Sequence, residues 1–112
     1  MEIRKWHVYL ADLSPQRGTG AGKVRPVVVV QTDLLNGVHP STVICPLTSN
    51  VRREAEALRV HLMLGEAGLA RPSDVMVDQI RAIENRRLRR PMGKIHRRSQ
   101  IKLALNLSNL LA

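Results

Sequence analysis

The sequence predicts a small α+β protein that is mainly β, a barrel of short strands with one C-terminal helix packed on it. Short β-branched or alternating stretches recur along the chain, and clusters of Gly, Pro, Asn and Ser separate them. Helical periodicity is confined to the C-terminal end. Because domains typically have ~100–150 residues, we expect a single domain over residues 1–112.

Several stretches have the composition of strands. One of them is nearly all valine and begins with Arg25 and Pro26, which predicts a buried strand with its proline at the start or on an edge. A glycine-rich loop is expected before it, and a capped turn that ends at Gly37 is expected after it. In chain order, the predicted strands are residues 6–13, 24–30, 42–47, 58–64, 75–83 and 91–95.

The predicted helix begins at Ser99, whose hydroxyl is suited to cap it. Lys102, Asn106 and Asn109 lie on its polar side. The opposite side is apolar and is expected to pack on the sheet. It consists of Leu103, Ala104, Leu107, Leu110 and Leu111.

The charge is strongly positive and unevenly distributed. The formal net charge is +9, and residues 81–102, here called the basic block, hold nine basic residues against one acidic residue. A segment of this charge density attracts nucleic acid, anionic lipid or an acidic protein partner. Its high share of arginine suits bidentate contacts to phosphate or carboxylate. The alternative is a solvated surface that keeps the protein soluble.

The remaining composition excludes several classes of protein. No apolar run approaches the ~20 residues of a membrane span, and the polar N-terminal segment is unlike a signal peptide. The lone Cys45 excludes an internal disulfide and is typical of the reducing cytoplasm. Trp6 and Tyr9 are the only aromatic residues, too few for a base-stacking platform. The histidines are scattered singly, so neither a metal nor a cofactor is expected.

Three polar features stand beside apolar strands and are the candidates for chemistry. Arg25 opens the valine-rich strand, and Thr48 and Ser49 follow the end of the next one. Residues 78–81, Asp-Gln-Ile-Arg, interrupt a third apolar stretch. Each feature alone fits an ordinary strand end or surface pair, so only their combination points to a function.

In this order and spacing, these features resemble the MazF/PemK-type toxins, the endoribonucleases of bacterial type II toxin–antitoxin systems. The resemblance runs from about Val8 to Leu111. Any one motif is weak, but five in order are specific. The matching segments are Val-Tyr-Leu-Ala-Asp-Leu-Ser-Pro from Val8, Arg17-Gly18 to Gly22-Lys23, Arg25-Pro26-Val27-Val28-Val29, Pro46-Leu47-Thr48-Ser49 and Asp78-Gln79-Ile80-Arg81-Ala82-Ile83.

The resemblance implies an SH3-like barrel of the PemK/CcdB kind, a homodimer, and metal-independent, sequence-specific cleavage of single-stranded RNA such as mRNA. It also implies inhibition by a cognate antitoxin with an acidic, disordered tail. The family's catalytic residues correspond to Arg25 and Thr48 and, in some members, to Asp78 as a general base. RNA contacts are expected from Arg17, Lys23, Ser49, Gln79 and Arg81.

Cleaving RNA without a metal requires the 2′-OH to attack the adjacent phosphate, which leaves a 2′,3′-cyclic phosphate and a 5′-OH. The step needs a base, an acid and a cation that stabilises the phosphorane. Arg25 offers a permanent charge and Thr48 a hydroxyl, but arginine, with a pKa above ~12, is a poor proton shuttle. An exposed aspartate near ~3.9 is a weak base at neutral pH. The residues that transfer protons therefore stay open.

Two other functions remain possible on the sequence alone. A non-catalytic basic barrel would bind nucleic acid or poison a protein target, and a structural barrel would serve a larger assembly. A pure binder needs the basic block but neither Arg25 nor Thr48. The presence of both residues favours the enzyme.

Overall fold

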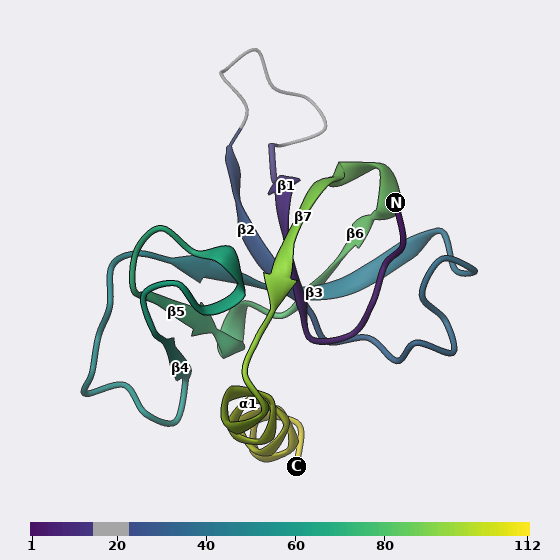
Figure 1. Cartoon of the computed structure of the whole chain (residues 1–112). Helices are drawn as coiled ribbons and strands as arrows, with labels where there is room; N and C mark the ends of the chain where they lie inside the picture. The colour runs from purple at the N-terminus through teal and green to yellow at the C-terminus, as the bar shows by residue number, and fades with distance from the viewer. Residues whose placement is uncertain (15–22) are drawn as a thin grey trace.

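The structure is a computed structural model that describes residues 1–14 and 23–112. These residues form seven strands, three single turns of 3-10 helix and a C-terminal α-helix (Figure 1). The α+β, mainly β fold predicted from the sequence is confirmed. The elements are β1 (His7–Asp12), β2 (Val24–Val29), β3 (Ser41–Thr48), β4 (Arg59–Leu62), η1 (Glu66–Gly68), β5 (Ser73–Met76), η2 (Val77–Gln79), β6 (Arg81–Glu84), η3 (Asn85–Arg87), β7 (Leu88–Lys94) and α1 (Arg97–Leu110).

The long strand β3 organises the sheet by changing partners along its length. Residues 41–44 pair with β6, residues 44–46 with β2, and residues 47–48 with β5, all antiparallel. The main path across the sheet is β4-β5-β3-β2-β1-β7. The helix α1 lies below the sheet in Figure 1 and packs against β4 and η2. One end of β3 therefore meets β2 and β5 together.

Alternation along the strands divides the buried side chains into two clusters. Val8 and Val28 belong to the cluster that Leu103 of α1 covers. Their chain neighbours Tyr9 and Val27 belong to the other cluster. The period of two in β1 and β2 therefore gives the sheet a core on both of its faces.

The stretch 75–83, predicted as one strand, is interrupted. Its first residues belong to β5, the 3-10 turn η2 follows, and the rest belongs to β6. Val77 at the start of η2 is buried, and its N–H donates to the carbonyl of Leu58 rather than to a strand. Through this turn the chain passes from β5, which pairs with one end of β3, to β6, which pairs with the other end. The apolar pattern alone does not predict this change.

The helix α1 begins at Arg97 with His96 as its cap residue, so the prediction that Ser99 caps it is wrong. Ser99 lies in the first turn, and its hydroxyl donates to Glu66 Oε2 at 2.7 Å. The same oxygen accepts the N–H of His96 at 2.8 Å. The buried carboxylate of Glu66 thus satisfies the helix N-terminus from a distant part of the chain.

The side of α1 that faces the sheet differs in part from the predicted apolar face. Leu103 is buried and Leu107 packs against the same cluster, as predicted. Asn106 is buried as well, and its Nδ2 donates to the carbonyl of Glu56 at 3.2 Å. Contact with the loop between β3 and β4 therefore sets the rotation of the helix. The predicted face residues Ala104, Leu110 and Leu111 are exposed.

Candidate active site

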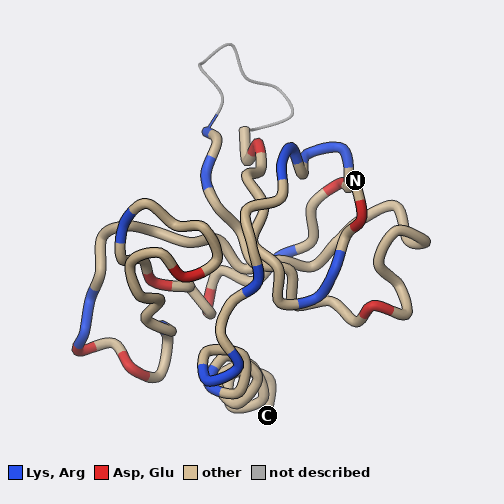
Figure 2. Tube along the Cα trace, in the orientation of Figure 1, with Lys and Arg blue, Asp and Glu red and all other residues tan. Residues whose placement is uncertain are grey.

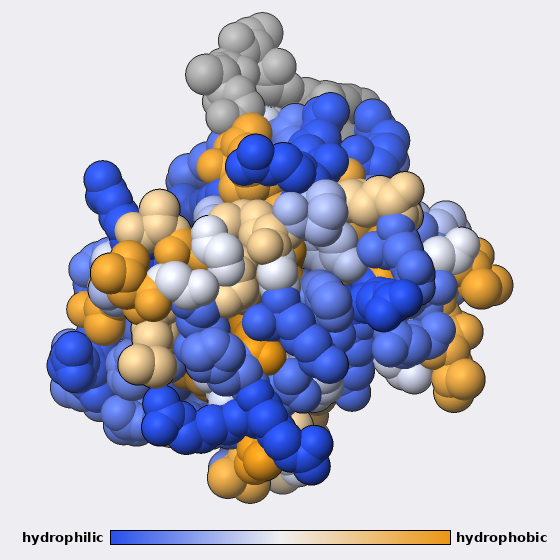
Figure 3. Space-filling view, viewed as in Figure 1, coloured by the Kyte–Doolittle hydropathy of each residue, from blue (hydrophilic) through white to orange (hydrophobic). Residues whose placement is uncertain are grey.

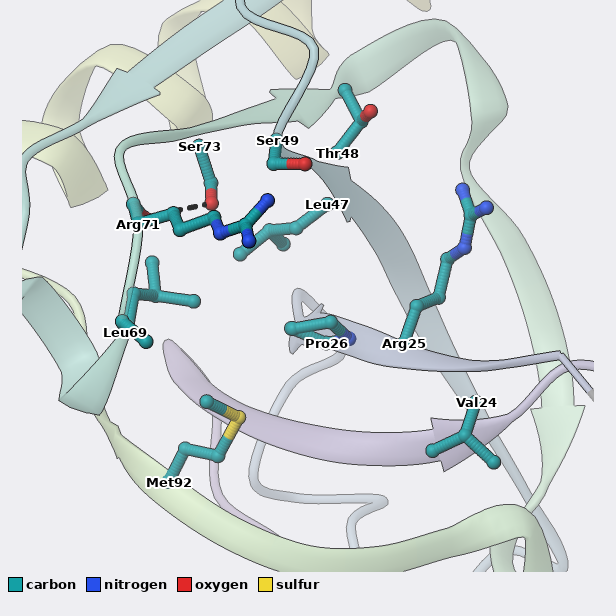
Figure 4. Close-up of a pocket in the computed structure, with 11 residues that line it drawn as sticks. Val24, Arg25, Pro26, Leu47, Thr48, Ser49, Leu69, Arg71, Ser73 and Met92 are labelled. Atoms are coloured by element: carbon teal, nitrogen blue, oxygen red, sulfur yellow. Dashed lines mark hydrogen bonds between the residues drawn. The ribbon is translucent and has the colours of Figure 1, made fainter.

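A cavity of about 350 Å³ opens where the start of β2 faces the end of β3. The segment between η1 and β5 forms its opposite wall, and β7 contributes one side chain. Figure 4 shows these side chains around the hollow. The lining residues are Val24, Arg25, Pro26, Leu47, Thr48, Ser49, Leu69, Ala70, Arg71, Ser73 and Met92.

Two prolines end the β2–β3 ladder at this cavity. Pro46 pairs with Val27 in its last pair, and Pro26 stands next along β2. Neither proline has an N–H to donate. Beyond this point β3 pairs with β5 instead, Leu47 lying opposite Val75. The strand ends of β2 and β3 are therefore unpaired with each other, which leaves room for the cavity.

Arg25 and Thr48 lie level with each other at these strand ends. Extending the register of Val27 with Pro46 by two residues places Arg25 opposite Thr48. Both side chains are partly exposed and line the cavity. In Figure 4 the guanidinium of Arg25 points up the wall toward Thr48. The two residues are 23 positions apart in sequence, and the ladder brings them to one site.

The cavity is positively charged. Among the described residues that line it there is no carboxylate, and the charged ones are Arg25 and Arg71. Within residues 1–14 and 23–112, no ion pair or side-chain hydrogen bond engages either guanidinium. The hydroxyls of Thr48 and Ser49 lie beside them. Two unpaired cations with hydroxyl donors in one hollow form a site for an anion such as phosphate.

The buried carboxylate of Asp74 fixes the chain behind Thr48, its partner across β3 and β5. It accepts hydrogen bonds from Arg52 N at 2.8 Å, Arg59 Nη1 at 3.2 Å and His61 Nδ1 at 2.5 Å. Burial raises the pKa of Asp74, but these hydrogen bonds outweigh it and hold the pKa below its usual value. An ionised Asp74 therefore anchors the backbone beside the cavity without lining it.

Of the predicted site residues, the structure brings Arg25, Thr48 and Ser49 together around the cavity. Lys23 lies next to the lining residue Val24 in the chain and is exposed. Arg17 lies outside the described residues.

The motif Asp78-Gln79-Ile80-Arg81 lies elsewhere. Asp78 and Gln79 are exposed on η2, Arg81 is exposed at the start of β6, and none of them lines the cavity. Arg81 borders a separate hollow near Leu13. Asp78 is close enough to act on the buried thiol of Cys45, whose pKa burial raises to about 12 with a smaller contribution from the Asp78 charge. Within a single protomer, Asp78, the general base implied by the resemblance, therefore does not line the Arg25 cavity.

The basic block is spread over β6, η3, β7 and α1 rather than gathered in one patch (Figure 2). The face in Figure 3 is largely hydrophilic, with small apolar areas between charged side chains. Several members of the block already have partners in the fold. The contacts are Arg86 with Glu84, Arg87 with the carbonyls of Asp12 and Ser14, Arg89 with Asp12, and Lys102 with Glu56. The formal charge of the basic block is therefore larger than the charge that is free to bind a partner.

Sequence reasoning missed Arg71. This residue lies in the turn-rich segment before β5, outside every motif. Its charge and the following Pro72 were the only signals available. Its position opposite Arg25 follows from the packing of that segment on β7, which sequence periodicity does not report.

Residues 1–14 and 23–112 contain no group of three or more His, Cys, Asp or Glu side chains that could hold a metal ion. No helix in this part of the chain has the length and apolar character needed to cross a membrane.

Comparisons with known proteins agree on one protein family. Residues 4–111 match the family described as PemK-like, MazF-like toxin of type II toxin–antitoxin system. Endoribonuclease EndoA of Bacillus subtilis (strain 168) is 33% identical, with 94% of this chain and 97% of EndoA covered. Endoribonuclease MazF of Staphylococcus epidermidis is 32% identical, with 95% of this chain and 90% of that protein covered.

Solved structures show the same fold. MazE–MazF (Form-III) from Deinococcus radiodurans matches with a TM-score of 0.79 at 24% identity, over 97% of this chain and 95% of the matched chain. Mycobacterium tuberculosis toxin MazF-mt6 matches with a TM-score of 0.78 at 24% identity, over 94% of this chain and 95% of that chain. An endoribonuclease in complex with its cognate antitoxin, from Mycobacterial species, matches with a TM-score of 0.78 at 22% identity, over 97% of this chain and 94% of that chain.

Proposed function

Because the chain belongs to the PemK-like, MazF-like toxin family of type II toxin–antitoxin systems, we propose that it is a sequence-specific endoribonuclease that cleaves single-stranded RNA at the Arg25 cavity. The observation that carries this proposal is that Arg25 and Thr48, at the ends of neighbouring strands, line one cavity. No described residue that lines this cavity is a carboxylate. A phosphate diester placed there meets a cation and a hydroxyl donor. Both relatives described above, at 33% and 32% identity, carry the name endoribonuclease.

The proposed reaction is attack of a ribose 2′-OH on the adjacent phosphorus. The bond from phosphorus to the 5′-oxygen breaks and the leaving oxygen takes a proton from solvent water, so the products end in a 2′,3′-cyclic phosphate and a 5′-OH. Arg25 binds the phosphoryl oxygens and stabilises the charge that builds up on them, because its planar guanidinium matches two oxygens at once. Thr48 donates a hydrogen bond to the same phosphate and holds it in line for attack. Neither role requires a metal ion.

Asp78 is proposed as the general base that takes the 2′-OH proton. This role follows the family resemblance, and the position of Asp78 on η2 requires the reacting ribose to extend beyond the Arg25 cavity. A single substitution at Asp78 therefore tests this role. Lys23, Gln79 and Arg81 are proposed as RNA contacts outside the cavity. Arg17 is proposed as a further RNA contact.

The proposal includes a partner and an assembly. A cognate antitoxin with an acidic tail inhibits the enzyme, in keeping with the net charge of +9. The MazE–MazF and toxin–antitoxin complexes among the similar structures support such a partner. The active form is a homodimer of this one toxin domain, acting in the cytoplasm. Sedimentation of the purified protein tests the dimer directly.

The experiment is cleavage of a long mixed-sequence single-stranded RNA in the presence of EDTA, with both fragment ends mapped. We expect discrete cuts that share a short sequence, with 2′,3′-cyclic phosphate and 5′-OH ends. Intact RNA, with folded protein verified by circular dichroism, contradicts the proposal and favours a non-catalytic binder. Cleavage that returns only when a divalent metal is added contradicts the metal-free mechanism.

A further inference from the structure

We propose that Arg71 is a second phosphate-binding residue, which holds a phosphate next to the scissile one and leads the RNA strand out of the cavity toward Arg53. This inference rests on the proposed function and deepens it, because it adds a binding residue and a path for the substrate. The observation behind it is that Arg71 faces the cavity from the wall opposite Arg25.

The first argument is electrostatic. Arg25 and Arg71 share one cavity, and within the described part of the chain no carboxylate neutralises either of them. By contrast, the nearby Arg59 is paired with the carboxylate of Asp74. Two unpaired like charges repel each other in the free protein, and an anion between them removes that repulsion. A strand with one phosphate per nucleotide supplies an anion to each guanidinium.

The second argument is that the backbone of Arg71 is held in place. Buried Ser73 donates its hydroxyl to the carbonyl of Arg71 at 3.1 Å, and Pro72 restricts the backbone between them. Upstream, Gly68 has a φ of +75°, and a Cβ added there would come within 2.6 Å of the carbonyl oxygen of Met92. The segment is therefore packed directly on β7. The backbone that carries this guanidinium is therefore held before a phosphate binds, so binding has to order the side chain alone.

The buried carboxylate of Glu66 ties the other end of this segment to α1. It accepts hydrogen bonds from the N–H of Met63, the N–H of His96 and the hydroxyl of Ser99. Arg71 is thus carried by a segment that is fixed at both ends.

The third argument is the continuity of the surface. A second hollow shares Ser49 and Arg71 with the Arg25 cavity and continues to Arg53. Arg53 is exposed on the loop between β3 and β4. Arg71 lies at the junction of the two hollows. A strand whose scissile phosphate sits at Arg25 therefore passes Arg71 before it reaches Arg53. Glu54 is the one acidic residue that lines the second hollow.

RNA fits this track better than an acidic peptide does. The track starts at the hydroxyl of Thr48 and the guanidinium of Arg25, the groups proposed to act on a phosphate diester. The hydroxyl of Ser49 lies between the two cavities and can donate to a phosphate or ribose oxygen. An acidic peptide that merely blocked Arg71 would leave substrate affinity insensitive to this residue.

The test uses a short RNA containing the mapped cleavage sequence, in the parent protein, Arg71→Ala and Arg71→Lys. We expect Arg71→Ala to raise KM about tenfold and to change kcat less than about threefold, because Arg71 binds a phosphate that does not react. Binding of the same strand with a 2′-O-methyl group at the cut site is measured in parallel by fluorescence anisotropy. The slope of log affinity against log salt should become shallower by about 0.7, the value for one phosphate contact on a single strand. Arg71→Lys keeps the charge and should keep the slope.

A second series of RNA strands identifies the phosphate that Arg71 contacts. A neutral methylphosphonate replaces one linkage at a time on either side of the cut, each with a 2′-O-methyl group on the preceding ribose. One such linkage should weaken binding to the parent about tenfold and leave binding to Arg71→Ala unchanged, because the group it would contact is missing. The matched control is Arg4→Ala, which removes an equal charge at a site where Arg4 is paired with Glu2. It should alter neither KM nor the salt slope.

The outcomes separate the two proposals. If the parent does not cleave RNA, the proposed function and this inference both fail. If the parent cleaves but Arg71→Ala keeps the parental KM and salt slope, the inference alone is overturned, and Arg71 is left to another partner such as the antitoxin. Equal loss in Arg71→Ala and Arg4→Ala also overturns it, because the effect is then one of net charge.

Discussion

Arg25 and Thr48 stand opposite each other at the ends of β2 and β3, two residues beyond the pair of Val27 with Pro46. Pro26 and Pro46 end the ladder at this point because neither has an N–H to donate. The chain thereby brings a guanidinium and a hydroxyl to the wall of one cavity. This relationship is the basis of the predictions below.

Thr48→Ala should reduce kcat about 10²-fold, because the loss of one donor to the developing charge typically costs ~10²–10³ in rate. Thr48→Ser keeps the hydroxyl and should recover most of the activity. Single-turnover cleavage of the mapped RNA measures both variants. Thr48 Oγ1 also accepts the N–H of Asn50 at 3.2 Å, so urea unfolding is measured beside the kinetics. An alanine variant with parental kcat, or a serine variant no better than alanine, contradicts the role of the hydroxyl.

Asp78→Asn should lower kcat by about 10²-fold, since a general base contributes ~10²–10⁴ in rate. The side chain is exposed on η2, so the variant should fold normally. The measurement is single-turnover kcat for the mapped RNA at neutral pH. A kcat equal to that of the parent would assign the proton transfer to another group.

The stability of the fold should fall at acid pH because of Glu66 and Asp74. Burial raises the pKa of Glu66, but hydrogen bonds from Ser99, His96 and Met63 outweigh it, so the folded pKa lies below the ordinary value of 4.5. The pKa of Asp74 lies below its ordinary value of 3.8 for the same kind of reason. Both carboxylates therefore add stability above the pKa of the unfolded chain, and this stability is lost as the pH falls through the folded pKa.

Urea unfolding between pH 3 and pH 7 measures this loss, with Glu66→Gln and Asp74→Asn as the matched variants. Glu66→Gln should lower the free energy of unfolding at pH 7 by about 2 kcal/mol, because buried donors lose an ionised acceptor. Below about pH 4.5, the ordinary pKa of a glutamate, the free energy of unfolding of Glu66→Gln should also change less with pH than that of the parent. A variant with the same pH dependence as the parent would show that Glu66 is not the group that titrates.

Much of the fold follows from local pattern. The valine-rich stretch and the alternating segments correspond to β1 to β4, and the C-terminal periodicity corresponds to α1. The break at Val77 was not predictable, because it depends on a hydrogen bond to Leu58 rather than on local sequence. The prediction that Ser99 caps α1 fails for a similar reason, because the acceptor of its hydroxyl, Glu66, is 33 residues away in the chain.

The candidate site was predictable only where motifs carry it. Arg25, Thr48 and Ser49 belong to segments that resemble the family, and the structure places them around one cavity. Arg71 belongs to no motif and reaches this cavity through the packing of Gly68 on β7. Asp78 also lies in a segment that resembles the family, yet on η2 it does not line the cavity. The sequence motifs thus predicted the residues that line the cavity at the strand ends, but not those of the opposite wall.

The most direct test of the account is single-turnover cleavage of the mapped RNA by Arg25→Ala and Arg25→Lys, beside binding of the 2′-O-methyl strand. The account predicts that Arg25→Ala folds as the parent does, binds the uncleavable strand within about tenfold of the parent, and loses ~10²–10³ or more in kcat. Arg25→Lys should recover only part of the rate, because a lysine cannot hold two phosphate oxygens in a planar fork. Cleavage by Arg25→Ala at the parental rate would contradict the claim that the Arg25 cavity is the site where the RNA is cut.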